Sequence, residues 1–193
     1  NVPHRAHECV LKNSLERTLC NGVFVQPVIG PKKKGDFAAD VVLEAYNMLI
    51  EKYFDSQIVV LGAFSTYSRY SGPREAVFTA LCRQNYGCSH FIVGRDHTGV
   101  GNFYKEDASQ KIFESLQDDI KIKPVFSDEV YYCSRCNDLI TDCEHGERFA
   151  ERVSGSKMRQ CLAEAKPLPD WFIRKEVFDY LLTRQKKGSS IYV

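Results

Sequence analysis

Two histidines near the start of the chain are the first side chains whose type and spacing could do chemistry. His4 and His7 are three residues apart and fall where a segment with helical periodicity begins, so they share one helix face. The first turn of a helix also exposes backbone N–H groups and the positive end of the helix dipole. The pattern therefore predicts a place where a nucleoside triphosphate could be held. The alternative is that His4 and His7 are ordinary polar residues of the surface.

A glycine-rich run lies in the middle of the chain. Residues 94–101 read Gly-Arg-Asp-His-Thr-Gly-Val-Gly and directly follow an apolar segment at residues 89–93. In an open parallel sheet, ligands bind beyond the carboxyl ends of the strands, and glycines let the backbone approach a nucleotide closely. The alternative is a plain connection in which Arg95 and Asp96 form a local ion pair.

Arginines mark a third candidate segment, residues 68–75, which reads Ser-Arg-Tyr-Ser-Gly-Pro-Arg-Glu. Planar guanidinium groups suit the oxygens of sulfate or phosphate. Pro73 fits the first turn of a helix, and Glu75 fits its positive end. For Arg74, a role in solubilising that helix is the better interpretation, so Arg69 is the candidate anion ligand.

A cluster of cysteines with one histidine predicts a metal site. Cys133, Cys136, Cys143 and His145 offer thiolate and imidazole ligands, which suit tetrahedral Zn²⁺, and the first two, with two residues between them, form the usual knuckle. We expect a structural zinc rather than a catalytic one. Reduced cysteines in a loop are the alternative, and Cys161 or water are other possible fourth ligands.

The elements that position these residues alternate along the chain. Continuous apolar strands between amphipathic helices predict parallel βαβ units and an open doubly wound α/β sheet with helices on both faces. This rhythm stops near residue 127, so we expect a catalytic domain over residues 1–127 and a small C-terminal domain, with a Cys-containing loop at 132–148, over residues 128–193. The expected helices are residues 3–20, 39–54, 73–86, 107–116, 156–165 and 170–184, and the expected strands are residues 22–30, 57–64, 89–93 and 120–126.

Composition excludes some classes of partner. The 193 residues carry a formal net charge of +1, which gives no whole-surface attraction for nucleic acid or membrane. No stretch approaches the ~20 apolar residues of a membrane span. Only three of the eight cysteines cluster in sequence, which is typical of a reducing cytoplasm. The run Lys32 to Lys34 could guide anions toward the site, but a solvated loop is the better interpretation.

Four segments together resemble the ATP sulfurylases. They are the His-Arg-Ala-His of residues 4–7, the arginine run ending at Glu75, residues 85–93 and the glycine-rich run, in this order. The resemblance spans nearly the whole chain. It implies a Rossmann-like nucleotidylyltransferase that transfers AMP from ATP to sulfate, giving adenylyl sulfate and pyrophosphate, or runs in reverse. It also implies Mg²⁺ bound with ATP and a homo-oligomer.

The resemblance also implies roles for individual residues. His4 and His7 would hold the ATP phosphates, Arg69 would bind sulfate, and Asn1 would lie near the phosphates. Several prokaryotic sulfurylases carry zinc in the region of the cysteine cluster. The residues that would line the nucleotide or contact phosphate are Gly94, Arg95, Asp96, His97, Gly155 and Ser156.

Two departures from the family pattern stand out. Ser71 replaces a more usual alanine, and the chain begins at Asn1, without the family's preceding Gln-Thr-Arg, first strand and β-rich domain. We therefore expect the sequence to be a piece of a longer polypeptide. The competing functions are another adenylyltransferase, or a non-catalytic nucleotide-binding or zinc-ribbon module. Arg69 favours the sulfurylase over another adenylyltransferase. Both histidines and the glycine-rich run favour it over a non-catalytic module.

Overall fold

The computed structural model describes residues 1–94, 103–105, 107–116 and 118–193, which form two compact units. The first unit contains residues 1–13, 20–67 and 130–193, and the second contains residues 14–19 and 68–129. Arg95, Asp96 and His97, three of the predicted nucleotide residues, lie outside the described residues. The predicted catalytic and C-terminal domains, divided at residue 127, stay a prediction.

A parallel strand pair lies in the first unit. β1 (Val23–Val25) pairs with β2 (Val59–Leu61) in the register Val23 to Val59. Beyond the strands the two segments stay paired, and the Gly30 N–H donates to the Thr66 carbonyl at 2.9 Å. A Cβ on Gly30 would lie 2.2 Å from that carbonyl oxygen, so only glycine permits this approach.

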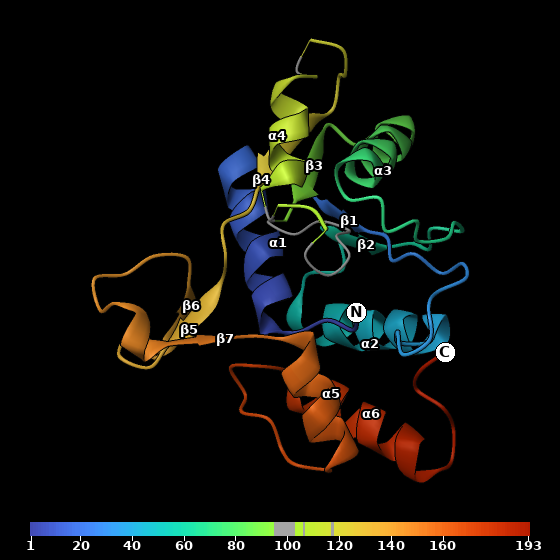
Figure 1. The fold of residues 1–193 in the computed structure, drawn as a ribbon, viewed down its shortest axis with the longest axis vertical. Coiled ribbons are helices and arrows are strands. Elements are labelled where there is room, and N and C mark those ends of the chain that lie inside the picture. Colours follow the sequence, from blue (N-terminus) through green and yellow to red (C-terminus); the bar gives the residue numbers. More distant parts are fainter. Residues whose placement is uncertain (95–102, 106, 117) are drawn as a thin grey trace. The chain divides into compact units, whose positions relative to one another are not determined.

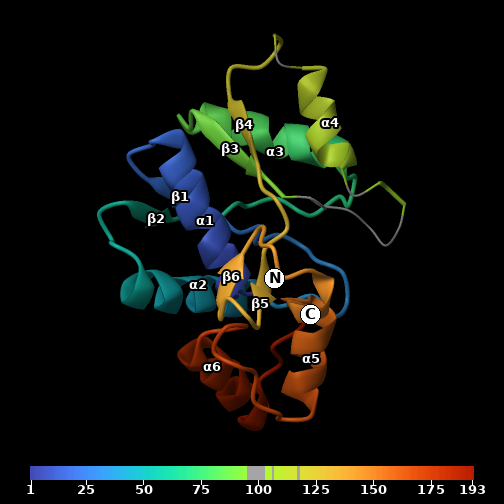
Figure 2. The same ribbon diagram turned by 90° about the vertical axis from the view of Figure 1, so that its left-hand side faces the viewer.

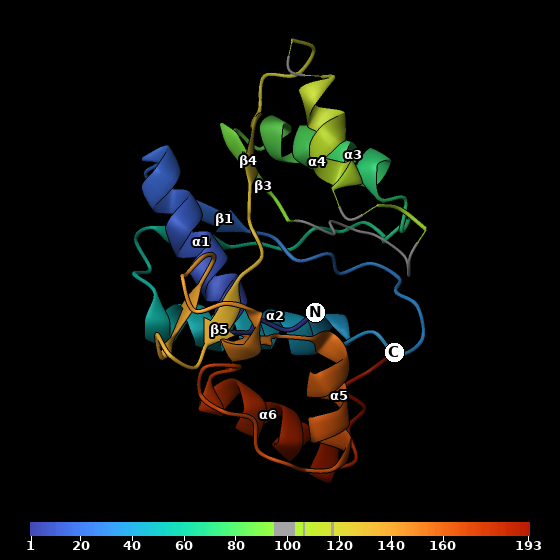
Figure 3. The ribbon, with the colours of Figure 1, turned by 60° about the vertical axis from the view of Figure 1, so that its left-hand side comes forward.

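Helices supply the main core of the first unit. α2 (Ala39–Tyr53) buries a stripe of apolar residues at helical spacing and packs against α6 (Lys175–Lys186), which runs beside it in Figures 1 and 3. α5 (Gly155–Ala163) adds Met158 and Leu162 to the same core. The buried residues of this core are Val2, Phe37, Val41, Val42, Ala45, Met158, Leu162, Phe172, Ile173, Val177, Phe178, Leu181 and Ile191.

An antiparallel sheet stands where a loop was expected. Its order is β6 (Asp138–Ile140), β5 (Tyr131–Cys133) and β7 (Ala150–Arg152), with the short 3-10 helix η1 (Glu147–Phe149) leading into β7. β5 and β6 are visible side by side in Figure 2. The hairpin closes through Asn137, which has a φ of 55° and donates its N–H to the Cys133 carbonyl. Asparagine tolerates this left-handed conformation better than most residues.

The second unit repeats the α/β alternation. α3 (Pro73–Asn85) and α4 (Ala108–Glu114) accompany the parallel strands β3 (His90–Val93) and β4 (Lys123–Phe126). The buried residues of its core are Ala76, Ala80, Val93, Phe113 and Ile122.

The structure confirms an α/β fold with parallel strands, and the expected helices and strands are all present. α1 (Arg5–Thr18) begins directly after His4. The last helix starts at Lys175 rather than at residue 170, because Phe172 and Ile173 are buried in a turn in which the Phe172 N–H donates to Pro169. Among the described helices, none combines the length and apolar character needed to cross a membrane.

Candidate functional site

The paired histidines lie at the first turn of α1. His4 precedes the helix, and its carbonyl accepts the N–H groups of His7 at 2.9 Å and Glu8 at 3.3 Å. The two imidazole rings stack with their centroids 3.7 Å apart and their planes inclined by 15°. His7 Nδ1 also accepts the backbone N–H of His4 at 3.4 Å. The sequence prediction that both rings share one helix face is therefore confirmed.

Both imidazoles are uncharged at neutral pH. Burial lowers the pKa of His4 to about 4. Burial also lowers the pKa of His7, and the charge of His4 adds to the effect. The Nδ1 atom of His4 is buried and has no hydrogen-bond partner within the described part of the chain. A polar atom in that position is available to a ligand.

A buried ion pair holds this end of α1 in place. Glu8 is 3% exposed and receives the Arg174 guanidinium, whose Nε and Nη2 lie 3.0 and 2.7 Å from the two carboxylate oxygens. Arg174 in turn lies 3.7 Å over the Tyr53 ring. The Arg5 N–H donates to the Phe172 carbonyl at 3.0 Å. The residues just before α6 therefore fix the turn that carries the histidines.

Asn1 and Gly155 meet at the start of α5. Arg159 Nη2 donates to Asn1 Oδ1 at 3.4 Å. A Cβ on Gly155 would lie 3.2 Å from Arg159 Nη1 and 3.9 Å from Asn1 Nδ2. The Ser154 hydroxyl caps the helix by accepting the Lys157 N–H at 3.1 Å. Ser156 is exposed in the first turn. Five of the predicted site residues (Asn1, His4, His7, Gly155 and Ser156) thus belong to the first unit.

Arg69 and Gly94 belong to the second unit. The buried carboxylate of Glu75 accepts the Arg69 N–H at 2.9 Å and the Ser71 N–H at 3.1 Å. The Arg69 guanidinium lies 4.4 Å over the Phe78 ring. Glu75 thus holds the backbone of Arg69 and Ser71 in place, whereas the sequence predicted for it only a place at the positive end of the helix. Glu75 stands three residues after Gly72, which precedes the helix. A glutamate at this spacing typically accepts backbone N–H groups just before the helix, so the sequence did hold a sign of this contact.

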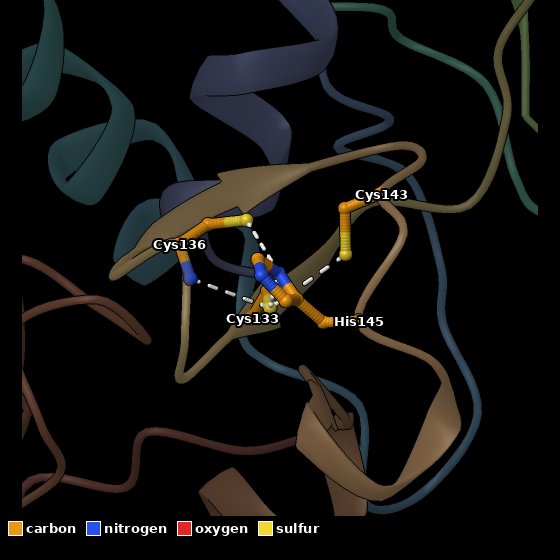
Figure 4. A group of neighbouring side chains, drawn as sticks. All are labelled: Cys133, Cys136, Cys143 and His145. Atoms are coloured by element: carbon orange, nitrogen blue, oxygen red, sulfur yellow. Dashed lines mark hydrogen bonds between the residues drawn. The ribbon is translucent and has the colours of Figure 1, made fainter.

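The cysteine cluster converges on one point (Figure 4). The ligand atoms of Cys133, Cys136, Cys143 and His145 all lie within 4.8 Å of one another. The Sγ atoms of Cys133 and Cys143 are 3.7 Å apart, and His145 Nδ1 is 3.6 Å from Cys133 Sγ and 3.3 Å from Cys136 Sγ. Zn–S bonds of ~2.3 Å place two sulfurs of a tetrahedron about 3.8 Å apart, so the donor set and its spacing fit zinc.

A backbone contact within this cluster favours the thiolate form of Cys133. The backbone N–H of Cys136 donates to Cys133 Sγ at 3.5 Å and lowers the pKa of that thiol. Cys161, the alternative fourth ligand, is not part of the group that converges in the described chain. His145 therefore fits the fourth position despite its close spacing to Cys143.

Comparisons with known proteins identify the family. A profile of the ATP-sulfurylase family matches residues 1–184, and the chain belongs to this family. A sulfate adenylyltransferase from Carboxydothermus hydrogenoformans is 45% identical over 184 residues, which are 94% of this chain and 48% of the relative. One from Staphylothermus marinus is 42% identical over 185 residues, covering 95% of this chain and 48% of the relative.

A solved structure shares the fold. The hexameric APS kinase from Thiobacillus denitrificans superposes with a TM-score of 0.74 at 14% identity, covering 98% of this chain and 35% of that one. At that identity the likeness concerns the fold alone. The chain spans about half the length of the curated relatives it matches.

Proposed function

We propose that this chain supplies the catalytic part of a sulfate adenylyltransferase, which transfers AMP from ATP to sulfate and releases pyrophosphate, or runs the reverse reaction. The observation that carries the proposal is the stacked pair His4 and His7 at the start of α1. Both rings are uncharged, and the buried Nδ1 of His4 has no hydrogen-bond partner among the described residues. Membership of the ATP-sulfurylase family, with relatives named sulfate adenylyltransferase, supports the same reaction.

The chemistry is an in-line displacement. A sulfate oxygen bonds to the α-phosphorus of ATP while the bond from that phosphorus to the bridging oxygen breaks, and the electron pair leaves with pyrophosphate. His4 and His7 would donate N–H groups to the phosphates as this charge develops, and Asn1 would contribute its amide. Catalysis then depends on positioning and charge stabilisation, without a covalent enzyme intermediate.

The other predicted site residues have proposed roles in binding the two substrates. Arg69 would bind sulfate with its planar donors, and Glu75 would hold the loop that carries it. The residues proposed to contact the nucleotide or its phosphates are Gly94, Arg95, Asp96, His97, Gly155 and Ser156.

Two metal ions belong to the proposal. Mg²⁺ bound with ATP would neutralise phosphate charge. A zinc ion held by Cys133, Cys136, Cys143 and His145 would cross-link the segment between β5 and η1, which buries few apolar side chains. This zinc would be structural, because four protein ligands leave no open position.

Further proposals concern the sheet, the domain division, the oligomeric state and the location of the protein. We propose that the parallel strands are part of a doubly wound sheet and that the protein is a homo-oligomer. We also propose that residues 1–127 form the catalytic domain and residues 128–193 a small C-terminal domain that shares its core and does not fold separately. None of the eight cysteines, all of them described, forms a disulfide, which supports a cytoplasmic location.

The test measures pyrophosphate release from ATP with and without sulfate. We expect release that depends on sulfate or on molybdate, and a loss of at least ~100-fold in kcat for His4→Ala and His7→Ala. Release that depends instead on a nucleotide or pantetheine phosphate would identify another adenylyltransferase. Normal turnover in both histidine variants would remove the phosphate role of the pair.

A further inference from the structure

Arg5 stands between the two histidines and is held through both its backbone and its side chain. Its backbone N–H donates to the Phe172 carbonyl at 3.0 Å, and its guanidinium Nη1 donates to the Asp170 carbonyl at 3.1 Å. Both acceptors belong to the tryptophan turn (residues 169–173), in which Phe172 is fully buried. The position of the histidine turn (residues 4–7) therefore depends on the position of the tryptophan turn.

Trp171 lies between those two acceptors and is the one tryptophan of the chain. Its ring stacks on the Tyr132 ring of β5, with the centroids 4.6 Å apart and the planes inclined by 6°. Aromatic pairs have preferred geometries and contribute more than the area they bury. The stack thus joins the tryptophan turn to a strand that lies far away in the sequence.

The hairpin that carries the cysteine cluster sets the place of the Tyr132 ring. Tyr132 directly precedes Cys133, and its hydroxyl donates to Asn137 Oδ1 at 2.7 Å across the hairpin turn. Asn137 in turn donates its N–H to the Cys133 carbonyl at 2.8 Å. Cys133 and Cys136, two of the proposed zinc ligands, belong to the same turn. A metal ion that holds these two residues would also hold the ring on which Trp171 stacks.

A cavity separates part of this hairpin from the start of α1. It has a volume of about 290 Å³ and is lined by Arg5, Asp170, the stacked pair and residues 137–139. Further along α1 the hairpin makes a weak contact, in which the Cys9 thiol lies 3.9 Å from the Leu139 carbonyl oxygen. Close packing transmits position, and a cavity interrupts it. The stack is therefore the contact through which the hairpin fixes the tryptophan turn.

We infer that Trp171 is a positioning residue for the histidine turn, and that the hairpin of the cysteine cluster holds Trp171 through the stack on Tyr132. This rests on the proposed function, because the histidine turn carries the proposed phosphate ligands His4 and His7. Loss of the stack lets the tryptophan turn shift, together with the two carbonyls that hold Arg5. A displacement of about 1 Å in a catalytic group can lower the rate by about 100-fold.

Substitutions of Tyr132 test the positioning role by steady-state kinetics. Tyr132→Leu removes the stacked ring, Tyr132→Phe keeps it, and Tyr86→Leu is a control that removes a ring 61% exposed in the second unit. We expect Tyr132→Leu to lower kcat by about tenfold or more. The KM for sulfate should stay within about twofold, since Arg69 belongs to the second unit. Tyr132→Phe should keep most of the kcat, and Tyr86→Leu should match the parent protein.

Two spectroscopic measurements do not depend on turnover. The fluorescence emission reports Trp171 alone, because the chain has one tryptophan. Removing zinc from the zinc-loaded protein with a chelator should change this emission in the parent and in Tyr132→Phe, but not in Tyr132→Leu, where the stack is already lost. NMR titration of the histidine rings should show the pKa of His4 rising from about 4 toward 6.5 in Tyr132→Leu, because water reaches the loosened turn.

An unchanged kcat and an unchanged His4 titration in folded Tyr132→Leu would overturn the inference, as would equal losses in Tyr86→Leu. Trp171 emission that does not respond to zinc removal, or a protein that takes up no zinc, would overturn the role of the hairpin. If Tyr132→Leu does not fold, Trp171→Leu and Trp171→Phe are compared instead, and equal kcat and His4 titration in the two would overturn the role of Trp171. A shifted His4 pKa in a protein without sulfate-dependent turnover would leave this inference standing and remove the proposed function.

Discussion

At the scale of single residues, the first turn of α1 holds two stacked imidazoles whose pKa values are lowered by burial. The spacing of His4 and His7 predicted a shared helix face, which the structure confirms. Their stacking and low pKa values depend on burial by segments far away in the chain, and no local pattern encodes that. The same holds for Lys32, whose sequence context is that of an exposed loop although its ammonium contacts Phe37.

The lowered pKa of His4 predicts a pH dependence of stability. In the unfolded chain His4 takes up a proton near its ordinary pKa of 6.5, whereas in the folded chain it does so only at about 4. The unfolded state therefore binds more protons between these values, and the free energy of unfolding falls as the pH is lowered from 6.5 to 4. The loss from His4 is at most about 3.4 kcal/mol. Urea unfolding from pH 7 to 4.5 should show a smaller fall in His4→Asn than in the parent, and equal falls would contradict the assignment.

Arg69 predicts a difference between the two substrates. Its backbone is held by Glu75 and its guanidinium by the Phe78 ring, so replacing its side chain should leave the loop in place. We expect Arg69→Ala to raise the KM for sulfate at least tenfold, because one charge-assisted contact is worth about 1.5–3 kcal/mol, and to change the KM for ATP little. Steady-state kinetics with each substrate varied provides the measurement. Equal losses for both substrates would show that Arg69 is not selective for sulfate.

At the scale of elements, periodicity predicted the α/β alternation because α2 buries an apolar stripe of helical spacing and each strand of residues 23–126 buries an apolar residue. The sheet of β5, β6 and β7 escaped prediction because its strands are three residues long and rich in polar residues. The late start of α6 escaped as well, because Phe172 and Ile173 are apolar whether they belong to a helix or to a buried turn.

The metal cluster predicts a stability that depends on zinc. Cys133 and Cys136 lie at the turn between β5 and β6, so losing the ion should loosen that hairpin and the loop that carries Cys143. We expect about one zinc per chain in the parent protein and none in the Cys133→Ser, Cys136→Ser double variant, with a lower Tm. Elemental analysis with thermal melts measures both. Cys88→Ser, which changes a thiol outside the cluster, serves as the control. A parent protein purified without zinc would refute the prediction.

At the scale of the whole molecule, the first unit is assembled from segments that are far apart in sequence. Eight of the thirteen buried residues of its main core come from residues 158–191, and the rest come from residues 2–45. The division predicted at residue 127 would separate these two groups. A chain split there would expose the apolar stripe of α2 that packs against α6.

We therefore expect residues 1–129 expressed alone not to fold their first unit. Exposing a single buried Leu or Phe costs about 1.5–3 kcal/mol, against a total stability of about 5–15 kcal/mol for a typical domain. Circular dichroism and limited proteolysis of the truncated and intact chains would show the difference, with residues 130–193 added in trans as the control for restored folding. A truncated chain that resists proteolysis through α2 would show that residue 127 is a true folding boundary.

The discontinuous first unit also has a consequence during synthesis of the chain. α2 leaves the ribosome with its apolar stripe uncovered, and Leu181 and Ile191, which help to cover that core, follow more than a hundred residues later. At translation rates of about 5–20 residues per second, this interval is on the order of 10 s. The contiguous stretch of residues 68–129 in the second unit is complete well before the first unit can close. In the nascent protein the apolar stripe of α2 thus stays exposed for seconds. Chaperones that bind apolar helices have their longest opportunity to act on this helix.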